Sequence, residues 1–230
     1  MVVGALGIST APATTRQGVN YAVSNRTLPS YVKLWDFLDR HFHYALLAKQ
    51  ITQGLRSDEE RALAIFKWTR AHIRPTPPDW AVVDDHILHI VIRGHGLDDQ
   101  MADVFTTLST YTGVPAFWNR VRLDGPTRGL VLSFARLDGR WAVFDVANGF
   151  VFRDAQGHLA SVEELAANPQ LIAFTVRDLE PGGRPYPDYL AACVPLEVAT
   201  PLRAELQMPW PRFWYEIRQG LKSRAQGTER

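Results

Sequence analysis

Apolar side chains recur at steps of three and four residues from Tyr31 to Gln53, and this spacing predicts an amphipathic helix. A second helix is predicted after Ser57, because Ser57 and Glu60 form a capping-box pattern ahead of an apolar run. Residues 1–28 show no sustained periodicity, so they predict a flexible N-terminal arm.

The segment HILHIVIR at 86–93 fits a helix or a strand by periodicity alone, and we favour a short helix. A glycine-containing turn, GHGL at 94–97, then leads into a helix predicted from Asp98 to Thr112, with Asp98 as its N-cap. Gly113 and Pro115 are expected to end this helix.

Four short apolar runs follow, with Asp-Gly or Asn-Gly among the residues between them, and they predict an antiparallel meander: AFWNRVRL, GLVLSFARL, RWAVFDV and FVFRD. The run LIAFTVR at 171–177 is expected to add another strand. Because helices come first and strands second, the predicted class is α+β, with N-terminal helices packed on an antiparallel sheet.

The chain is therefore divided into the arm, a domain at 29–177 and a proline-rich C-terminal wrap at 178–230. The wrap is expected to have little regular structure apart from a short aromatic and basic helix near its end. That helix is interpreted as packing on its own domain, with membrane contact through residues 209–224 as the alternative.

Composition narrows the class of protein. Apolar residues make up 46% and charged residues 21% of the 230 residues, as is typical of a globular domain. The formal net charge of +1 gives no overall field to attract nucleic acid. The opening MVVGALGIST has no basic segment before its apolar residues, so a cytoplasmic location is expected.

Three segments together resemble the transglutaminase-like superfamily, whose fold is that of papain-like cysteine hydrolases. They are DEERALAIFKWTRAHI, RGHGLDDQMADVFTTLSTYTGVPAFW and GLVLSFARLDGRWAVFDVANG, which span roughly residues 57–150. The matching features are a helix with a central tryptophan, a glycine turn into a helix that ends in Gly-Val-Pro, and an Asp-Gly hairpin that leads to an aspartate. The resemblance implies a transglutaminase-like domain.

The resemblance also assigns the catalytic triad of the family to three positions. Asp98 stands where the family has its cysteine, Leu130 where it has its histidine, and Asp145 where it has its aspartate. An imidazole has to activate a thiol in this chemistry, and neither group is present. The chain is thus expected to be a degenerate member without thiol-dependent transglutaminase or protease activity.

The sequence also contains candidates for other chemistry. Cys193 is the only cysteine, and it is expected to be a buried, inert thiol rather than a substitute nucleophile. A metal could be held by His86, His89 and His95 with Asp98, although their spacing matches no strong ligand motif, so no metal or other cofactor is expected. A carboxylate pair, Asp98 with Asp145 or with Asp99, could serve acid–base chemistry.

The favoured hypothesis is a binding or scaffolding module in a bacterial-type biosynthetic or processing pathway. Its cleft would retain aromatic and polar side chains that recognise a peptide, a protein or a small molecule. The candidate ligand-binding residues are Trp80, His95, Asp99 and Trp118.

Overall fold

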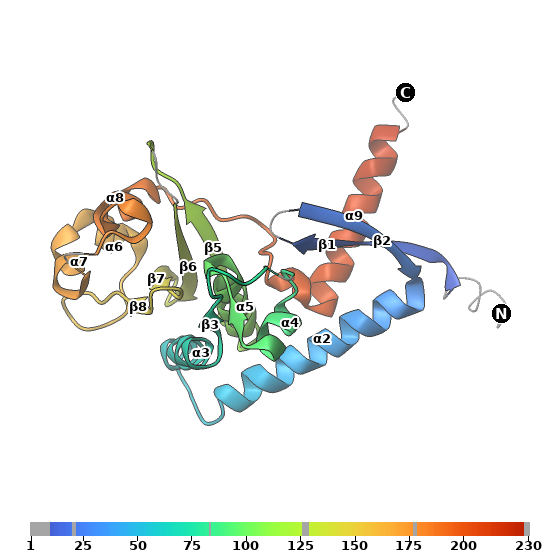
Figure 1. Ribbon diagram of the computed structural model, residues 1–230, viewed down its shortest axis with the longest axis horizontal. Coiled ribbons are helices and arrows are strands. Elements are labelled where there is room, and N and C mark those ends of the chain that lie inside the picture. Colours follow the sequence, from blue (N-terminus) through green and yellow to red (C-terminus); the bar gives the residue numbers. More distant parts are fainter. Residues whose placement is uncertain (1–9, 20–21, 83, 126–128, 177–178, 228–230) are drawn as a thin grey trace.

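The computed structural model describes residues 10–19, 22–82, 84–125, 129–176 and 179–227 (Figure 1). The strands are β1 Pro12–Val19, β2 Ala22–Pro29, β3 Arg74–Pro75, β4 His95–Gly96, β5 Ala116–Val121, β6 Leu130–Leu137, β7 Arg140–Asp145 and β8 Phe150–Val151. The α-helices are α2 Ser30–Ile51, α3 Asp58–His72, α4 Ile87–Arg93, α5 Asp98–Tyr111, α6 Val162–Ala167, α7 Pro169–Val176, α8 Tyr186–Ala192 and α9 Pro209–Gly227, with 3₁₀ turns η1 Pro181–Gly183 and η2 Glu205–Gln207.

Helix α5 lies at the centre of the fold and packs on β5 and β6, while α2, α3 and α4 surround it. Its residues 99–110 are all buried. The four-stranded sheet is antiparallel in the order β5-β6-β7-β8. These features confirm the predicted α+β class, with helices early in the domain packed on an antiparallel meander.

The sheet is covered on both faces, and this explains the continuous apolar sequence of β6 (Figure 1). Ala135 and Leu137 belong to the apolar cluster that contains α5, whereas Leu130, Leu132 and Phe134 belong to a second cluster with α6, α7 and α8. Strands buried on both sides have near-continuous apolar runs because neither face contacts water. Leu130, the candidate site residue at the start of this strand, is therefore placed by core packing.

The turn between β6 and β7 follows the prediction from its Asp-Gly pair. Asp138 and Gly139 both have positive φ, 48° and 82°. A two-residue hairpin needs this backbone conformation at both central positions, and Asp-Gly adopts it at low cost. The register pairs Leu137 with Arg140 directly across the turn.

Helix α2 confirms the helix predicted near residues 31–53. Trp35 and Phe42, two of its periodic apolar residues, are 69% and 65% exposed. Tyr44 and Ala48, each 1% exposed, lie on the side that packs on the domain, and the periodic residue Leu47 packs against the same core. Part of the periodic apolar side of this helix thus faces solvent.

The N-terminal arm is more regular than its sequence suggested. Strands β1 and β2 pair antiparallel along their full length, from Pro12 opposite Pro29 to Val19 opposite Ala22. The backbone N–H and the hydroxyl of Ser30 both donate to the Ala11 carbonyl, at 2.8 and 2.7 Å, and so join this hairpin to the start of α2. The expectation of an arm without regular structure is wrong for these residues, while the division of the chain into arm, domain and wrap stays a prediction.

Two further differences lie after the sheet. The strand expected at 171–177 is wrong over its described part, because residues 171–176 belong to α7; position 177 lies outside the described residues. Ile172 and Val176 are 2% and 5% exposed, an i,i+4 pair that buries one side of a helix. The proline-rich wrap contains α8, and its terminal helix α9 extends over 19 residues rather than a few.

Candidate functional site

Asp98 is the first residue of α5, and Leu97 rather than Asp98 is the N-cap. The Gln100 side chain accepts a hydrogen bond from the Leu97 N–H at 3.1 Å. The Asp98 carboxylate accepts from the N–H of Asp99 at 2.8 Å. The predicted N-cap role of Asp98 is thus off by one position, although an acidic side chain in the first turn still interacts favourably with the helix dipole.

The Asp98 carboxylate is held by Arg120 of β5. The guanidinium donates to both carboxylate oxygens, at 2.9 and 3.1 Å, which is the bidentate geometry of strong arginine–carboxylate pairs. Asp99 lies on the same guanidinium, with 3.5 Å between its Oδ2 and an arginine nitrogen. The position that the resemblance matches to the family cysteine therefore carries a carboxylate paired with an arginine.

Leu130 is the first residue of β6 and is 4% exposed. It pairs across the ladder with Val121 and belongs to the apolar cluster that includes Phe152 and Tyr186. This setting fills the core and offers no proton-accepting group.

Asp145, the third triad position, is completely buried. Its carboxylate accepts a hydrogen bond from the Tyr186 hydroxyl at 2.6 Å and two more from Asn148, from its N–H and its side-chain amide, each at 2.9 Å. Burial raises the pKa of Asp145 above its ordinary value despite these donors. Since Asp145 joins α8 to the sheet while Asp98 pairs with Arg120, the two carboxylates are bound by different partners rather than by each other.

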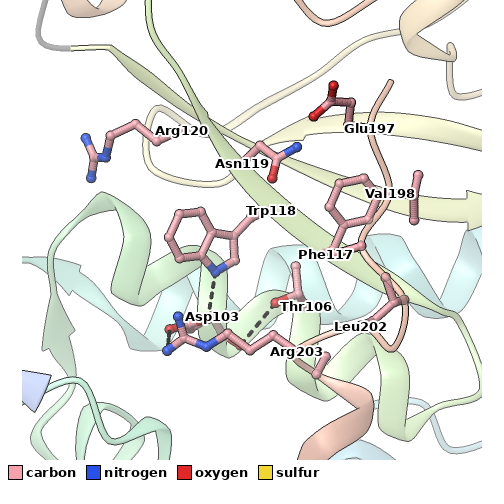
Figure 2. Close-up of a pocket in the computed structure, with 12 residues that line it drawn as sticks. Asp103, Thr106, Phe117, Trp118, Asn119, Arg120, Glu197, Val198, Leu202 and Arg203 are labelled. Carbon is pink, nitrogen blue, oxygen red and sulfur yellow. Dashed lines mark hydrogen bonds and ion pairs between the residues drawn. The ribbon is translucent and has the colours of Figure 1, made fainter. Parts of the chain in front are cut away.

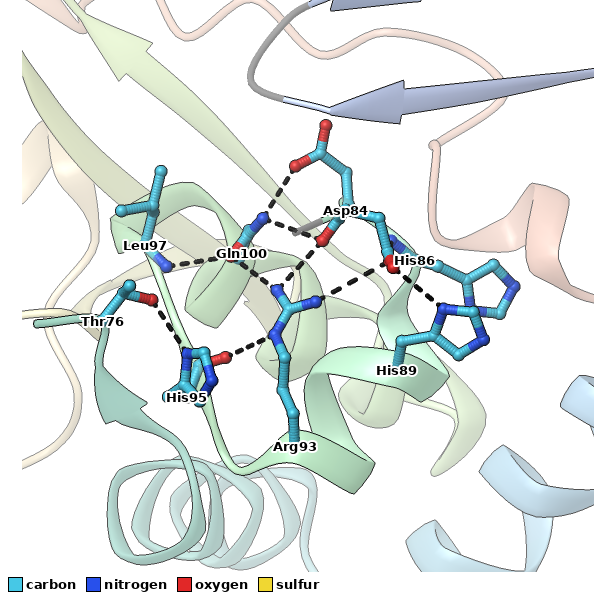
Figure 3. A network of polar contacts seen from close by, with 9 residues as sticks. Thr76, Asp84, His86, His89, Arg93, His95, Leu97 and Gln100 are labelled. Atoms are coloured by element: carbon cyan, nitrogen blue, oxygen red, sulfur yellow. Dashed lines mark hydrogen bonds and ion pairs between the residues drawn. The ribbon is translucent and has the colours of Figure 1, made fainter. Parts of the chain in front are cut away.

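The histidines expected as weak metal candidates take part in a structural network (Figure 3). Asp84 accepts from the N–H of His86 at 2.8 Å and contacts His89 Nδ1 at 3.1 Å. Arg93 and Gln100 both donate to the Asp84 carbonyl, at 3.0 Å. The network ties α4 and the preceding loop to the start of α5.

No histidine of this network has the surroundings of a metal ligand. Arg40 lies 2.8 Å from His86 Nε2, and burial, with help from this cation, lowers the pKa of His86 to about 4. His95 instead contacts the Thr76 hydroxyl at 3.2 Å and the edge of Trp80. Among the described residues, no three histidine, cysteine, aspartate or glutamate side chains form a group that could hold a metal ion.

A cavity of about 570 Å³ lies between α5, β5 and the C-terminal wrap (Figure 2). Its floor is formed by Asp103 and Thr106 of α5, and one wall by β5. The opposite wall belongs to residues 197–204. Aromatic, amide and charged side chains of β5 therefore lie across the cavity from residues 197–204 of the C-terminal wrap.

Asp103 organises the inner end of this cavity. It is 4% exposed, accepts from Trp118 Nε1 at 2.6 Å and pairs with Arg203 at 2.8 Å. Burial raises the pKa of Asp103 to about 6, because the loss of solvation outweighs these two contacts. The Arg203 guanidinium also lies over the Trp118 ring at 5.9 Å, so the three side chains hold the wrap against α5.

Of the four predicted ligand-binding residues, Trp118 alone lines this cavity. Asp99 is connected to it through Arg120, which lines the cavity and pairs with Asp99. Trp80, 58% exposed, and His95 contact each other and are not among the lining residues. The sequence analysis missed Asp103, Arg120 and Arg203. The available signal for Asp103 was a charged residue between two apolar pairs, Met101-Ala102 and Val104-Phe105.

Cys193 is 8% exposed within the second apolar cluster, as expected for an inert thiol. Burial raises its pKa to about 11, which disfavours the nucleophilic thiolate. Among the described residues, no helix has the length and hydrophobicity needed to cross a membrane.

Comparison with known proteins gives only distant similarity. No protein-family model and no curated protein matches the chain. One similar solved structure, from Parabacteroides distasonis and described as a "putative protease", has 12% identity and a TM-score of 0.36, covering 60% of this chain and 36% of its own. Another, described as a TGase, has 14% identity and a TM-score of 0.32, covering 70% of this chain and 49% of its own. The chain thus spans about a third and about half of their lengths.

Proposed function

We propose that this chain is a catalytically degenerate transglutaminase-like protein that binds a peptide, protein or small-molecule partner in a bacterial-type biosynthetic or processing pathway. One observation carries the proposal: Asp98, Leu130 and Asp145, the positions of the family triad, each have a non-catalytic role. Asp98 is paired with Arg120, Leu130 fills the core, and Asp145 is bound by Tyr186. A cytoplasmic location stays a prediction from the sequence.

The absence of thiol chemistry follows from the groups present at these positions. Amide hydrolysis or transfer needs an activated nucleophile and a base within hydrogen-bond reach of it. Asp98 is a poor nucleophile toward amides, and Leu130 supplies no base. Cys193 is buried with a raised pKa, so it does not replace the missing thiol.

The cavity supports a binding role. Phe117 and Trp118 provide aromatic surface, while Asn119, Arg120 and Glu197 add hydrogen-bonding and charged groups. Pockets that bind ligands combine apolar walls with a few polar groups that set orientation. The cavity lies next to the Asp98–Arg120 pair, so the ligand would bind where the family performs its chemistry.

The absence of turnover is tested with Asp98→Cys. A cysteine at the N-terminus of α5 beside Arg120 should have a stabilised thiolate and react with iodoacetamide at least tenfold faster than Cys193. It should nevertheless show no amide hydrolysis or amine incorporation on casein, since Leu130 is not a base. Turnover by the wild-type protein that is lost in Asp98→Ala would contradict the proposal and favour a rebuilt carboxylate site.

The binding role is tested by selecting peptides from a phage-displayed library on the purified protein. Trp118→Ala should weaken selected peptides at least tenfold, as expected from loss of a large aromatic contact, whereas Trp80→Ala should leave their affinity within twofold. Fluorescence anisotropy of labelled peptides measures both. A library that yields no binder, or binders that are equally sensitive to both changes, would refute binding at this cavity.

A further inference from the structure

Most of the large apolar side chains that the described part of the chain leaves exposed lie on α2 and α9. We call these two sets the α2 stripe and the α9 stripe. The α2 stripe consists of Tyr31, Leu34, Trp35, Phe42 and Leu46, which are 46–69% exposed. The α9 stripe consists of Trp210, Phe213, Trp214, Ile217 and Leu221, which are 37–71% exposed.

Each stripe follows one side of its helix. Successive members of both sets are separated by one, three, four or seven residues, the spacing that aligns side chains along a single helical face. On α9, Arg212, Glu216 and Gln219 line a groove shared with β1 and α2, together with Tyr215 and with Leu34 at the edge of the α2 stripe. The members of the α9 stripe are not among the residues that line this groove.

The exposed apolar area of each stripe reaches the upper end of the range that is usual for a monomer. A packed aromatic side chain buries roughly 150–250 Å², so at the observed exposures each stripe leaves about 600 Å² of apolar surface in water. The largest apolar patch on a typical monomer is roughly 300–600 Å². Two stripes give about 1,200 Å² per copy, above the roughly 800 Å² that each partner buries in a standard interface.

We infer that the two stripes form an interface with a second copy of this chain. The formal net charge of +1 means that two copies do not repel each other strongly. Packing α2 of one copy against α9 of the other covers both stripes, and a twofold axis repeats this contact.

A lipid surface is the weaker occupant of the two stripes. Helices that lie on anionic membranes combine an apolar side with a strongly basic polar side. The α2 sequence instead mixes three basic residues with two acidic ones, so anionic lipid would attract it only weakly. A second copy covers both stripes with one contact.

Sedimentation velocity of the full chain between 1 and 100 µM tests the inference. The wild-type protein should approach twice its monomer mass of 25.9 kDa as the concentration rises. Leu34→Glu and Phe213→Glu should each weaken association at least 100-fold, because each buries an unpaired charge in the interface. Ile92→Glu is the matched control: Ile92 is 74% exposed on α4, outside both stripes, and its change should leave the dimer intact.

Cross-linking then tests the arrangement of helices. Leu34→Cys mixed with Phe213→Cys should give a disulfide-linked dimer under mild oxidation, while the wild-type protein, with its buried Cys193, should not. A cross-link by Leu34→Cys alone would still support a second copy but would overturn the pairing of α2 with α9.

Two results would overturn the inference itself. The first is a wild-type protein that stays monomeric at 100 µM, and the second is a dimer that survives both glutamate substitutions with unchanged far-ultraviolet circular dichroism. Vesicles of phosphatidylcholine with 30% phosphatidylserine identify the competing occupant. A monomer that sediments with them, and no longer does so after Phe213→Glu, would replace the second copy with a lipid surface.

Discussion

The surroundings of α5 and the outer side of α2 differ in where they place apolar groups. Around α5, residues from helices and strands bury a continuous core, and even Asp103 and Asp145 are enclosed with hydrogen-bond donors. On α2, the side that contacts the domain includes Arg40 and His41, while Trp35 faces water. The periodic spacing of apolar residues therefore establishes that a helix has an apolar side. It does not establish that this side is buried by the same chain.

The strongest test of this difference is the same substitution in both regions. Leu130→His should lower the free energy of unfolding by about 3–5 kcal/mol, because it removes a packed leucine and buries an imidazole without a planned partner. Leu34→His, on the α2 stripe, should change the stability of the monomer by less than about 0.5 kcal/mol. Urea unfolding at 1 µM measures both values.

Equal losses in the two variants would show that the α2 stripe is packed within the monomer. That outcome would remove the contrast between the regions and would also weaken the case for a second copy.

Asp103 gives a test that depends on pH. Its pKa in the folded protein, about 6, lies above the ordinary value of 3.8, so the folded state binds more protons than the unfolded state between these values. The stabilisation of the folded state by protonated Asp103 is therefore fully present below pH 3.8, and it is lost as the pH rises through 6. This loss is on the order of 3 kcal/mol, since one pKa unit corresponds to about 1.4 kcal/mol.

Asp103→Asn removes this dependence, so the stability of the variant relative to the wild type should improve by up to about 3 kcal/mol between pH 4 and pH 7. Denaturant unfolding across this range measures the difference. Arg203→Met sharpens the test: the Arg203 guanidinium lowers the pKa of Asp103, so its removal should move the transition above pH 6. A relative stability that stays constant with pH would contradict the burial of a titrating carboxylate.

A smaller effect is expected at Tyr186. Tyr186→Phe removes the hydroxyl that donates to the buried Asp145, and should cost about 1–3 kcal/mol because a buried acceptor loses a partner. Tyr31→Phe removes a hydroxyl from a side chain that is 46% exposed and should cost less than about 0.5 kcal/mol. Thermal unfolding of both variants under identical conditions measures their melting temperatures. Similar decreases relative to the wild type would argue against a structural role for the Tyr186–Asp145 contact.

Much of the fold could be predicted because its signals are local. The capping box of Ser57 and Glu60 marks the start of α3, and both expected hydrogen bonds are present. Gly94 ends α4 in the left-handed conformation, and the Asp-Gly pair defines the β6–β7 turn. Each depends on residues within a few positions of one another, so one sequence suffices.

The errors arise where distant residues decide the outcome. The run at 171–176 forms a helix, and one side of it packs in the second apolar cluster. So short an apolar run fits a helix or a strand equally well, so the sequence alone did not show this. The same applies to the site. The sequence resemblance proposed Asp98 and Asp145 as site positions, but the partner of Asp98 lies 22 residues later and Tyr186, the partner of Asp145, lies 41 residues later. Contacts between residues so far apart in the sequence leave no recognisable pattern in a short segment.

The positions of the two stripes have a consequence for how the protein is made. Helix α2 ends at Ile51 and α9 begins at Pro209, so a ribosome completes α2 long before it begins α9. At about 5–20 residues per second, the interval is roughly 8 to 30 s. Throughout that time the α2 stripe emerges without a cover, which makes the nascent chain a substrate for chaperones before it can meet another copy.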